Sequence, residues 1–297
     1  RSEDWKRANV SPIYKNGAKN SPNNYRPISL TSQVCKIMES IIRDKIIDHL
    51  QTKNLLKASQ HGFMNRRSCL TNLLYFLEKV TTYIDVGEPV DVIYLDFQKA
   101  FDKVPHKKFT SNIKALSIDG AIHNWIRNWL SERFQRVVLN GKQSPWLYTK
   151  SGVPQGSVLG PVLFLIYVNN IDQATDSLIV KFADDTKLVK VIRTVQDAVE
   201  FQDDLHRTLK WSQDWLMLFN IGKCKVMHLG HNNPQYQYNM EGQPLQVVTE
   251  EKDLGVIIHN SLKTSNQCAA AAKKANQILG MINRTFEFKS VEMVRSL

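Results

Sequence analysis

The chain has 297 residues, of which 42% are hydrophobic, enough to bury a sizeable core in one large domain or in two to three closely packed subdomains. Lys and Arg number 39 against 28 Asp and Glu, and the resulting net charge of +11 favours a polyanionic partner over the alternative of a merely basic soluble protein. The four cysteines form no C-x-x-C pair, which argues against a zinc site or a disulfide framework and for a reducing compartment. A secretory signal pattern is not seen, and the longest apolar run is too short to span a bilayer.

The first part of the chain predicts two strands, 10–14 and 25–29, joined by a turn rich in Lys, Asn and Gly. Lys15 and Arg26 stand at the two ends of this turn, which by itself is consistent with an ordinary solvated loop. Apolar residues at helical spacing then predict core helices over 32–50 and 70–84.

A nearly continuous apolar run over 92–97 predicts a strand buried on both faces, with Asp96 near its end. A carboxylate in such a run is costly to bury unless a cation or a metal ion accompanies it. Phe101 follows five residues after Asp96, and Asp102 is predicted to form hydrogen bonds rather than to bind metal.

The middle of the chain predicts helices over 113–134, in which Trp125 and Trp129 share one face and are interpreted as core residues. A hairpin over 134–149 follows. The next segment, 151–161, holds three glycines and two prolines, so its backbone can approach a ligand closely, and Gln155 offers an amide within it. A buried helix is predicted over 157–171.

Asp184 and Asp185 stand between two β-rich stretches, 179–182 and 188–192, where Asp-Asp-Thr predicts a tight hairpin turn. Two adjacent negative charges repel each other unless a cation lies between them. Mg²⁺ takes hard oxygen ligands and leaves room for water and phosphate, so a magnesium site is one interpretation and an exposed acidic turn is the other.

The last part predicts an amphipathic helix over 195–218, strands over 226–229 and 251–259, and an Ala-rich helix over 268–283.

These motifs, in their order, resemble those of reverse transcriptases. DFQKAFD (96–102), GVPQGSVLGP (152–161) and FADD (182–185) are similar to motifs A, B and C of that family. NYRPISL (24–30), QHGFMNRRSC (60–69), NIGKCK (220–225) and KDLGV (252–256) bring the resemblance closer to LINE-type (non-LTR) retrotransposon reverse transcriptases of the jockey and chicken-repeat kind. The resemblance covers essentially the whole chain.

The resemblance implies an α+β fold, the right-hand arrangement of polymerases with fingers, palm and the start of a thumb. We expect an antiparallel palm sheet with helices on one face. The expected division is fingers over 1–90, palm over 91–265 with an interleaved fingers segment at about 107–150, and the start of a thumb over 266–297.

The resemblance also implies the reaction, in which a primer 3′-hydroxyl attacks the α-phosphate of a deoxynucleotide paired to an RNA template. Two Mg²⁺ ions, or Mn²⁺ in their place, are expected on Asp96, Asp184 and Asp185. Lys223 is the expected proton donor to pyrophosphate. The residues expected to contact the nucleotide are Lys15, Arg26, Phe101, Gln155 and Gly156, with Phe101 as a steric gate against the 2′-hydroxyl. The residues expected to contact template or primer are Arg66, Arg67, Leu254 and Gly255.

The implied partners are an RNA–DNA hybrid and dNTPs, with no membrane, in a retrotransposon ribonucleoprotein of the nucleus and cytoplasm. The chain begins without Met inside a motif-bearing region, so we expect a fragment of a longer protein, without the endonuclease usual upstream. Two other classes stay open: a catalytically inactive nucleic-acid-binding relic, and an RNA polymerase on the same palm, which should leave space at Phe101.

Overall fold

The apolar run that precedes Asp96 forms the middle strand of a five-stranded sheet in the computed structural model, which describes residues 3–286. This strand, β3 (Val90–Leu95), pairs antiparallel with β8 (Asp185–Val191) and with β9 (Lys225–Leu229). β7 (Leu178–Phe182) pairs antiparallel with β8, and the short β12 (Gln246–Val247) runs parallel to β9 at the other edge. Five of the six residues of β3 are buried, as expected for a strand covered on both faces.

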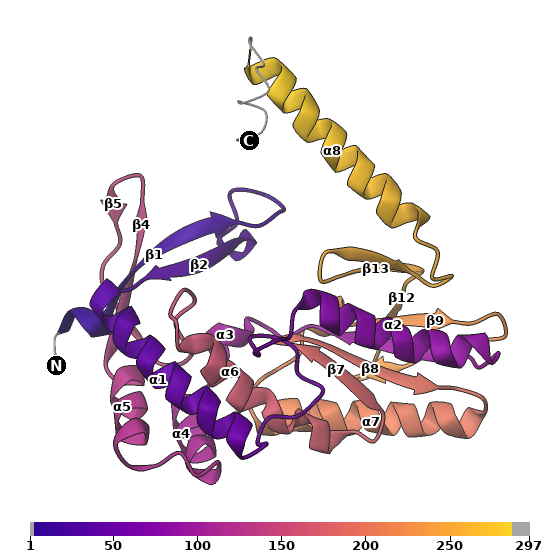
Figure 1. Ribbon diagram of the computed structural model, residues 1–297, viewed down its shortest axis with the longest axis horizontal. Helices are drawn as coiled ribbons and strands as arrows, with labels where there is room; N and C mark the ends of the chain where they lie inside the picture. The colour runs from indigo at the N-terminus through magenta and orange to yellow at the C-terminus, as the bar shows by residue number, and fades with distance from the viewer. Residues whose placement is uncertain (1–2, 287–297) are drawn as a thin grey trace.

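Helices cover both faces of this palm sheet. α7 (Val195–Asp214) lies on one face, where Phe201 and Leu205 share a hydrophobic cluster with Ile93. α2 (Cys69–Asp85) lies on the other face, where Phe76 packs in a cluster with Val92, and Figure 1 shows the two helices on opposite sides of the sheet. The α+β class with an antiparallel palm sheet is therefore confirmed, but helices cover two faces where one was expected.

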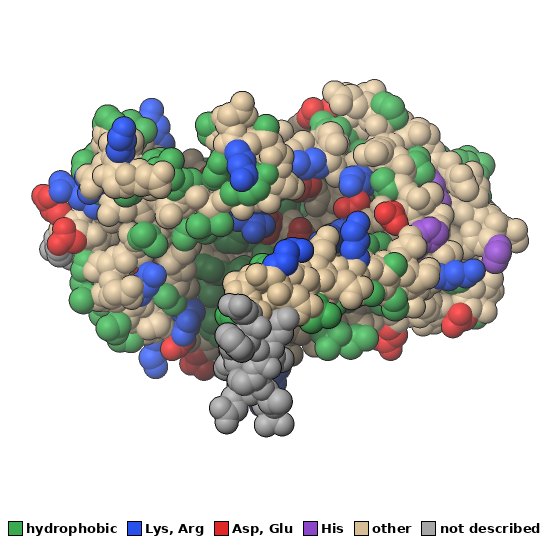
Figure 2. Space-filling view, turned by 90° about the horizontal axis from the view of Figure 1, so that it is seen from above, with side chains coloured by type: hydrophobic (Ala, Val, Ile, Leu, Met, Phe, Trp, Pro, Cys, Tyr) green, Lys and Arg blue, Asp and Glu red, His purple; other side chains and the backbone are tan. Residues whose placement is uncertain are grey.

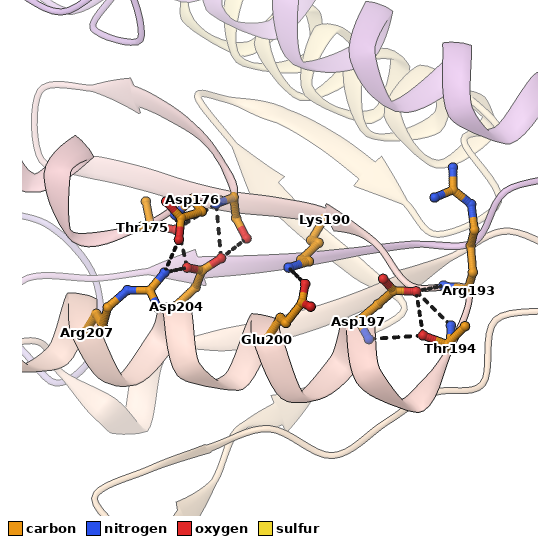
Figure 3. A network of polar contacts seen from close by, with 10 residues as sticks. Thr175, Asp176, Lys190, Arg193, Thr194, Asp197, Glu200, Asp204 and Arg207 are labelled. Carbon is orange, nitrogen blue, oxygen red and sulfur yellow. Dashed lines mark hydrogen bonds and ion pairs between the residues drawn. The ribbon is translucent and has the colours of Figure 1, made fainter.

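Polar contacts along α7 hold it against the strands (Figure 3). At its start, the Thr194 hydroxyl accepts the N–H of Asp197, and the Asp197 carboxylate accepts the N–H of Thr194. In the middle of the helix, the buried Asp204 carboxylate accepts the N–H groups of Asp176 and Ser177, each at 3.0 Å. These two residues lead into β7, so α7 fixes the start of the strand whose far end carries the paired carboxylates.

A second sheet joins segments that lie far apart in the chain. β1 (Arg7–Tyr14) and β2 (Tyr25–Leu30) form the predicted antiparallel hairpin, and β4 (Arg133–Leu139) pairs parallel with β1. β5 (Lys142–Gln143) and β6 (Leu147–Thr149) both pair antiparallel with β4. This sheet stands beside the palm sheet in Figure 1, and we call it the fingers sheet.

Three helices belong to the core next to the fingers sheet: α1 (Gln33–Thr52), α4 (His106–Ala115) and α5 (Gly120–Leu130). Trp125 and Trp129 of α5 are buried with their rings stacked at 6.1 Å, which confirms that they are core residues. α3 (Ala100–Lys103) begins within the first of the three core motifs, and α6 (Gly160–Val168) begins at the end of the second; almost every residue of α6 is buried. Short 3₁₀ turns cover Glu3–Lys6, Pro22–Asn24, Asn169–Ala174 and Ile221–Lys223.

The C-terminal part contains two small hairpins and one long helix. β10 (Asn239–Met240) pairs with β11 (Gln243–Pro244), and β13 (Glu250–Asp253) pairs with β14 (Val256–His259). The single strand expected over 251–259 is therefore a hairpin. α8 (Ser265–Thr285) projects away from the palm in Figure 1, with every residue at least partly exposed. The expected thumb continues into 287–297, which lie outside the described residues.

Among the helices of residues 3–286, none combines the length and the apolar character that crossing a bilayer would require.

Candidate active site

The three predicted metal-binding carboxylates come together at one edge of the palm sheet. Leu95 pairs with Thr186, so Asp96, the next residue after β3, lies across from the start of β8. Phe182 pairs with Asp185, which leaves Ala183 and Asp184 as the two-residue turn between β7 and β8. Asp185 is thus the first residue of β8 rather than part of the turn itself.

At this edge, burial and neighbouring negative charges raise the pKa values of two of the carboxylates. Burial raises the pKa of Asp184, and the negative charge of Asp96 raises it further, whereas a main-chain hydrogen bond and the cations Lys15 and Arg26 lower it. Burial, and next the charge of Asp184, raise the pKa of Asp185 to about 6. The charge of Asp96 therefore disfavours the ionised forms of Asp184 and Asp185, and the charge of Asp184 disfavours that of Asp185; a bound cation relieves this repulsion.

The donor set fits a hard divalent cation, because it consists of carboxylate oxygens. In the part of the chain that the structure describes, no three acidic, His or Cys side chains already converge closely enough to chelate an ion. The side chains that would hold Mg²⁺ here are those of Asp96, Asp184 and Asp185.

Lys223 lies against the first of these carboxylates. Its Nζ is 3.7 Å from Oδ2 of Asp96, and both side chains remain well exposed. The N–H of Asn220 donates to the main-chain oxygen of Asp96 at 2.7 Å, which ties the 3₁₀ turn of Lys223 to the end of β3. The structure therefore places this lysine beside one of the carboxylates expected to bind metal.

The turn after Asp96 is hydrogen-bonded to the segment 151–161, which we call the glycine-rich loop. The N–H of Val153 donates to the main-chain oxygen of Phe101 at 2.7 Å, and Nε2 of Gln155 donates to Oδ1 of Asp102 at 3.1 Å. Asp102 is therefore a hydrogen-bonding residue, as expected, and burial raises its pKa. The Phe101 ring is half-buried and stacks on the Phe164 ring with 4.5 Å between centroids.

The same loop also touches the fingers sheet. The N–H of Ser29 donates to the main-chain oxygen of Gln155 at 2.6 Å. Gly156 has φ +102°, and a Cβ there would lie 2.8 Å from the Ser29 oxygen, so a side chain is excluded by both conformation and space. A cavity of about 410 Å³ lies between the fingers sheet and this loop, with Lys99, Gln155 and Tyr148 among its lining residues.

The cations of the β1–β2 hairpin face the carboxylates. Lys15 and Arg26 are exposed at the hairpin, and their charges partly offset the rise that burial causes in the pKa of Asp184. Seen from above, Lys and Arg side chains gather around a hollow in this face, and acidic side chains are visible inside it (Figure 2). The hairpin is thus placed to bring positive charge to an anion bound over the carboxylates.

The two arginines predicted to hold template differ in their surroundings. Arg66 is exposed, with φ +60°. The guanidinium of Arg67 donates to the main-chain oxygens of Ala58 and Gln60, so it holds its own loop. A template contact for either residue stays a prediction. Arg67 would have to contact the template while it keeps its hydrogen bonds to the loop.

Sequence reasoning missed the residues that support the carboxylate turn from behind. Oε1 of Gln60 accepts the N–H groups of Gly62 at 2.8 Å and of Ala183 at 2.9 Å. A Cβ on Gly62 would lie 2.4 Å from the Ala183 nitrogen, so this close approach requires glycine. The Gln60-His61-Gly62 triplet could have indicated this support, but only Arg66 and Arg67 of that motif received a functional assignment from the sequence.

The turn expected to hold the primer is well defined. Leu254 and Gly255 connect β13 to β14 with φ of +46° and +93°, the two left-handed residues of a tight hairpin turn. The preceding residue, Asp253, is buried and forms an ion pair with Lys187 of β8.

Comparison with known proteins agrees with this geometry. The family model described as "Reverse transcriptase (RNA-dependent DNA polymerase)" matches residues 13–282. The probable RNA-directed DNA polymerase from transposon X-element of Drosophila melanogaster is 29% identical over 270 residues, which cover 88% of this chain and 30% of that protein. The RNA-directed DNA polymerase from mobile element jockey of the same species is 28% identical over 230 residues, covering 74% of this chain and 25% of that protein. The chain thus spans about a third of the length of these relatives or less.

Solved structures show the same fold. Apo telomerase from Candida tropicalis superposes with a TM-score of 0.60 at 12% identity, covering 89% of this chain and 49% of that one. Telomerase from the same organism in complex with a fragment of telomeric RNA gives a TM-score of 0.58 at 12% identity, covering 89% of this chain and 45% of that one. Since the family model matches nearly the whole chain and the carboxylates meet as its motifs predict, the chain belongs to the reverse transcriptase family.

Proposed function

We propose that this chain extends a DNA primer on an RNA template, as the polymerase part of a retrotransposon protein. The observation that carries the proposal is the meeting of Asp96 with Asp184 and Asp185 beneath the cations of the β1–β2 hairpin. The names of the mobile-element relatives support RNA-directed DNA synthesis as the reaction. The full-length protein would work in a ribonucleoprotein of the nucleus and cytoplasm.

Asp96, Asp184 and Asp185 would hold two Mg²⁺ ions, with Mn²⁺ as a substitute. When bound, the ions lower the pKa of the primer hydroxyl and neutralise charge on the phosphates. The chain's own contribution is to hold three oxygen-donor side chains on a rigid sheet edge.

The triphosphate would lie against Lys15 and Arg26, because two exposed cations at a hairpin match its negative charge. Phe101 would lie under the sugar, and its contact with Phe164 keeps the ring from turning away. Gln155 and Gly156, fixed between Asp102 and Ser29, would contact the nucleotide from the glycine-rich loop. Lys223, beside Asp96, would donate a proton to the departing pyrophosphate.

An RNA–DNA hybrid would occupy the hollow seen from above, bound through its backbone by the basic residues around it. Leu254 and Gly255 would contact the primer strand near its 3′ end, and Arg66 and Arg67 the template.

Primer extension on poly(rA)/oligo(dT) with Mg²⁺ tests this function. The wild-type chain should extend the primer with dTTP, and Asp184→Asn should not. Asp44→Asn, which changes an exposed aspartate of α1, is the matched control and should extend normally. Extension with UTP but not dTTP would favour an RNA polymerase, and hybrid binding without any extension would favour an inactive relic.

A further inference from the structure

A row of three side chains crosses the palm sheet directly behind the candidate active site. Tyr94 of β3 lies opposite Lys187 of β8 on one side and opposite Lys225 of β9 on the other. Each of the three is two residues along the chain from a residue of the site: Asp96, Asp185 and Lys223, respectively. Since side chains two apart on a strand share a face, Lys187 points to the same side of the sheet as Asp185.

Both lysines of this row pair with acids of the β13–β14 hairpin. Lys187 forms its ion pair with Asp253, and their side chains are only 3% and 4% exposed. Lys225 lies 2.6 Å from Glu251, and these side chains are 29% and 21% exposed. Because Glu251 and Asp253 are two residues apart on β13, both carboxylates point toward the palm sheet. The hairpin is thus held on the sheet by one buried ion pair and one partly exposed ion pair.

The Lys187–Asp253 pair is also in contact with α2. Lys187 also donates to Oδ1 of Asn72 at 3.1 Å, and its Nζ lies 4.6 Å from the centre of the Phe76 ring, so α2 restrains it as well. A buried ion pair adds little net stability compared with two apolar residues of similar size, because both charges lose water. What such a pair supplies here is a fixed separation between β8 and β13.

That separation matters because each partner adjoins a part of the site. Lys187 follows Asp185 by two residues on β8, and Asp253 immediately precedes the Leu254–Gly255 turn. Any change in the length of the pair therefore moves the turn relative to the carboxylates.

We propose that Lys187 and Asp253 form a positioning pair that sets the distance between the primer's terminal nucleotide and the catalytic carboxylates. This inference rests on the proposed function, in which the Leu254–Gly255 turn contacts the primer. The Lys225–Glu251 pair stabilises the same hairpin but reaches solvent, so it adapts to small changes in length.

The decisive variant is Asp253→Glu, which keeps the charge and lengthens the side chain by one methylene group. We expect hybrid affinity to be unchanged and kcat to fall about 100-fold, since a displacement of about 1 Å at the reacting atoms has that effect. Glu200→Asp is the matched control, because it also changes length by one methylene group, in the partly exposed ion pair with Lys190, which lies on β8 like Lys187. It should leave kcat at the wild-type value.

A double variant separates positioning from stability. Lys187→Met with Asp253→Leu removes both buried charges and should melt at or above the wild-type temperature. If the pair sets the distance, kcat stays low in this well-folded protein. Full recovery of kcat would show that the pair is structural only and would overturn the proposal.

A readout without metal or turnover completes the test. In EDTA, 2-aminopurine at the primer 3′ terminus should change its fluorescence between wild type and Asp253→Glu, while the same base placed well inside the hybrid should not. Equal fluorescence at the terminus, or wild-type kcat in Asp253→Glu, would overturn the proposal. Failure of the wild type to extend any primer would instead overturn the proposed function, and the fluorescence comparison would still report on the pair.

Discussion

Glu39, in the middle of α1, accepts the main-chain N–H of Val158 at 2.7 Å across 119 residues of chain. The same oxygen accepts the N–H of Leu159 at 3.3 Å, and the other oxygen accepts the indole N–H of Trp129 at 3.1 Å. Glu39 is fully buried, so these donors take the place of water. Through this one carboxylate, α1 fixes the residues that lead from the glycine-rich loop into α6.

Replacing Glu39 by Ala should destabilise the protein by about 3 kcal/mol or more, because the buried donors lose their acceptor. Glu39→Gln should cost less, since one acceptor oxygen remains. Urea denaturation measures both, with Glu78→Ala, an exposed glutamate on α2, as the control. Equal stability of Glu39→Ala and the control would contradict the hydrogen bonding described.

Loss of one metal-binding carboxylate should stop catalysis without stopping binding. Asp96→Asn and Asp184→Asn should each lower kcat on the order of a thousandfold or more, because a ligand that acts in the transition state is removed. Hybrid affinity should stay close to wild type. The measurement is single-turnover extension beside equilibrium binding, and near-normal extension by either variant would refute the assignment.

Gly62 should tolerate no side chain. In Gly62→Ala the new Cβ would meet the Ala183 nitrogen at 2.4 Å, so the carboxylate turn or the 60–62 loop must shift. We expect a marked loss of both thermal stability and extension. Gly280→Ala is the control: its nearest atom outside the local backbone is 3.7 Å away, and Ala should stabilise α8 by about 0.5–1 kcal/mol. Normal extension by Gly62→Ala would show that the contact is not needed.

Phe101 should govern the choice of sugar. Its ring is fixed against Phe164, so truncation to Ala opens space where a 2′-hydroxyl would lie. Discrimination between dGTP and GTP, as the ratio of kcat/KM, should fall roughly a hundredfold, the equivalent of about 3 kcal/mol.

Phe164→Leu is the control for packing in this pair, because Phe164 is fully buried behind the ring. It should lower the melting temperature and change the sugar ratio much less. A ratio that stays constant in Phe101→Ala, with both activities reduced together, would assign Phe101 to the core.

Binding of RNA–DNA hybrid should weaken steeply with salt, because the +11 charge implies release of counterions from several phosphates. The log–log slope of affinity against salt should be several units. Arg66→Ala should reduce it by about one unit if Arg66 contacts a phosphate. An affinity that does not change with salt would show that the basic residues do not contribute to hybrid binding.

The sequence by itself determined the local elements and the residues of the candidate site. The apolar run before Asp96 predicted a covered strand, the spacing of apolar residues predicted α1, α2 and α7, and the Asp184–Asp185 pair stood between two β-rich stretches. The ordered motifs also predicted the family. All of these depend on neighbours within a few residues, which is the range over which strand and helix periodicity act.

Tertiary structure alone decided which polar residues support that site. Glu39 lies in a helix whose sequence pattern predicts an ordinary core helix, and the three donors described above are 90, 119 and 120 residues away. Lys187 and Asp253 are 66 residues apart, and their pairing depends on a hairpin docking on the sheet. The covering of a second sheet face by α2 is of the same kind. A buried charge needs a partner, and the fold supplies that partner from a distant part of the chain, so local sequence patterns do not predict it.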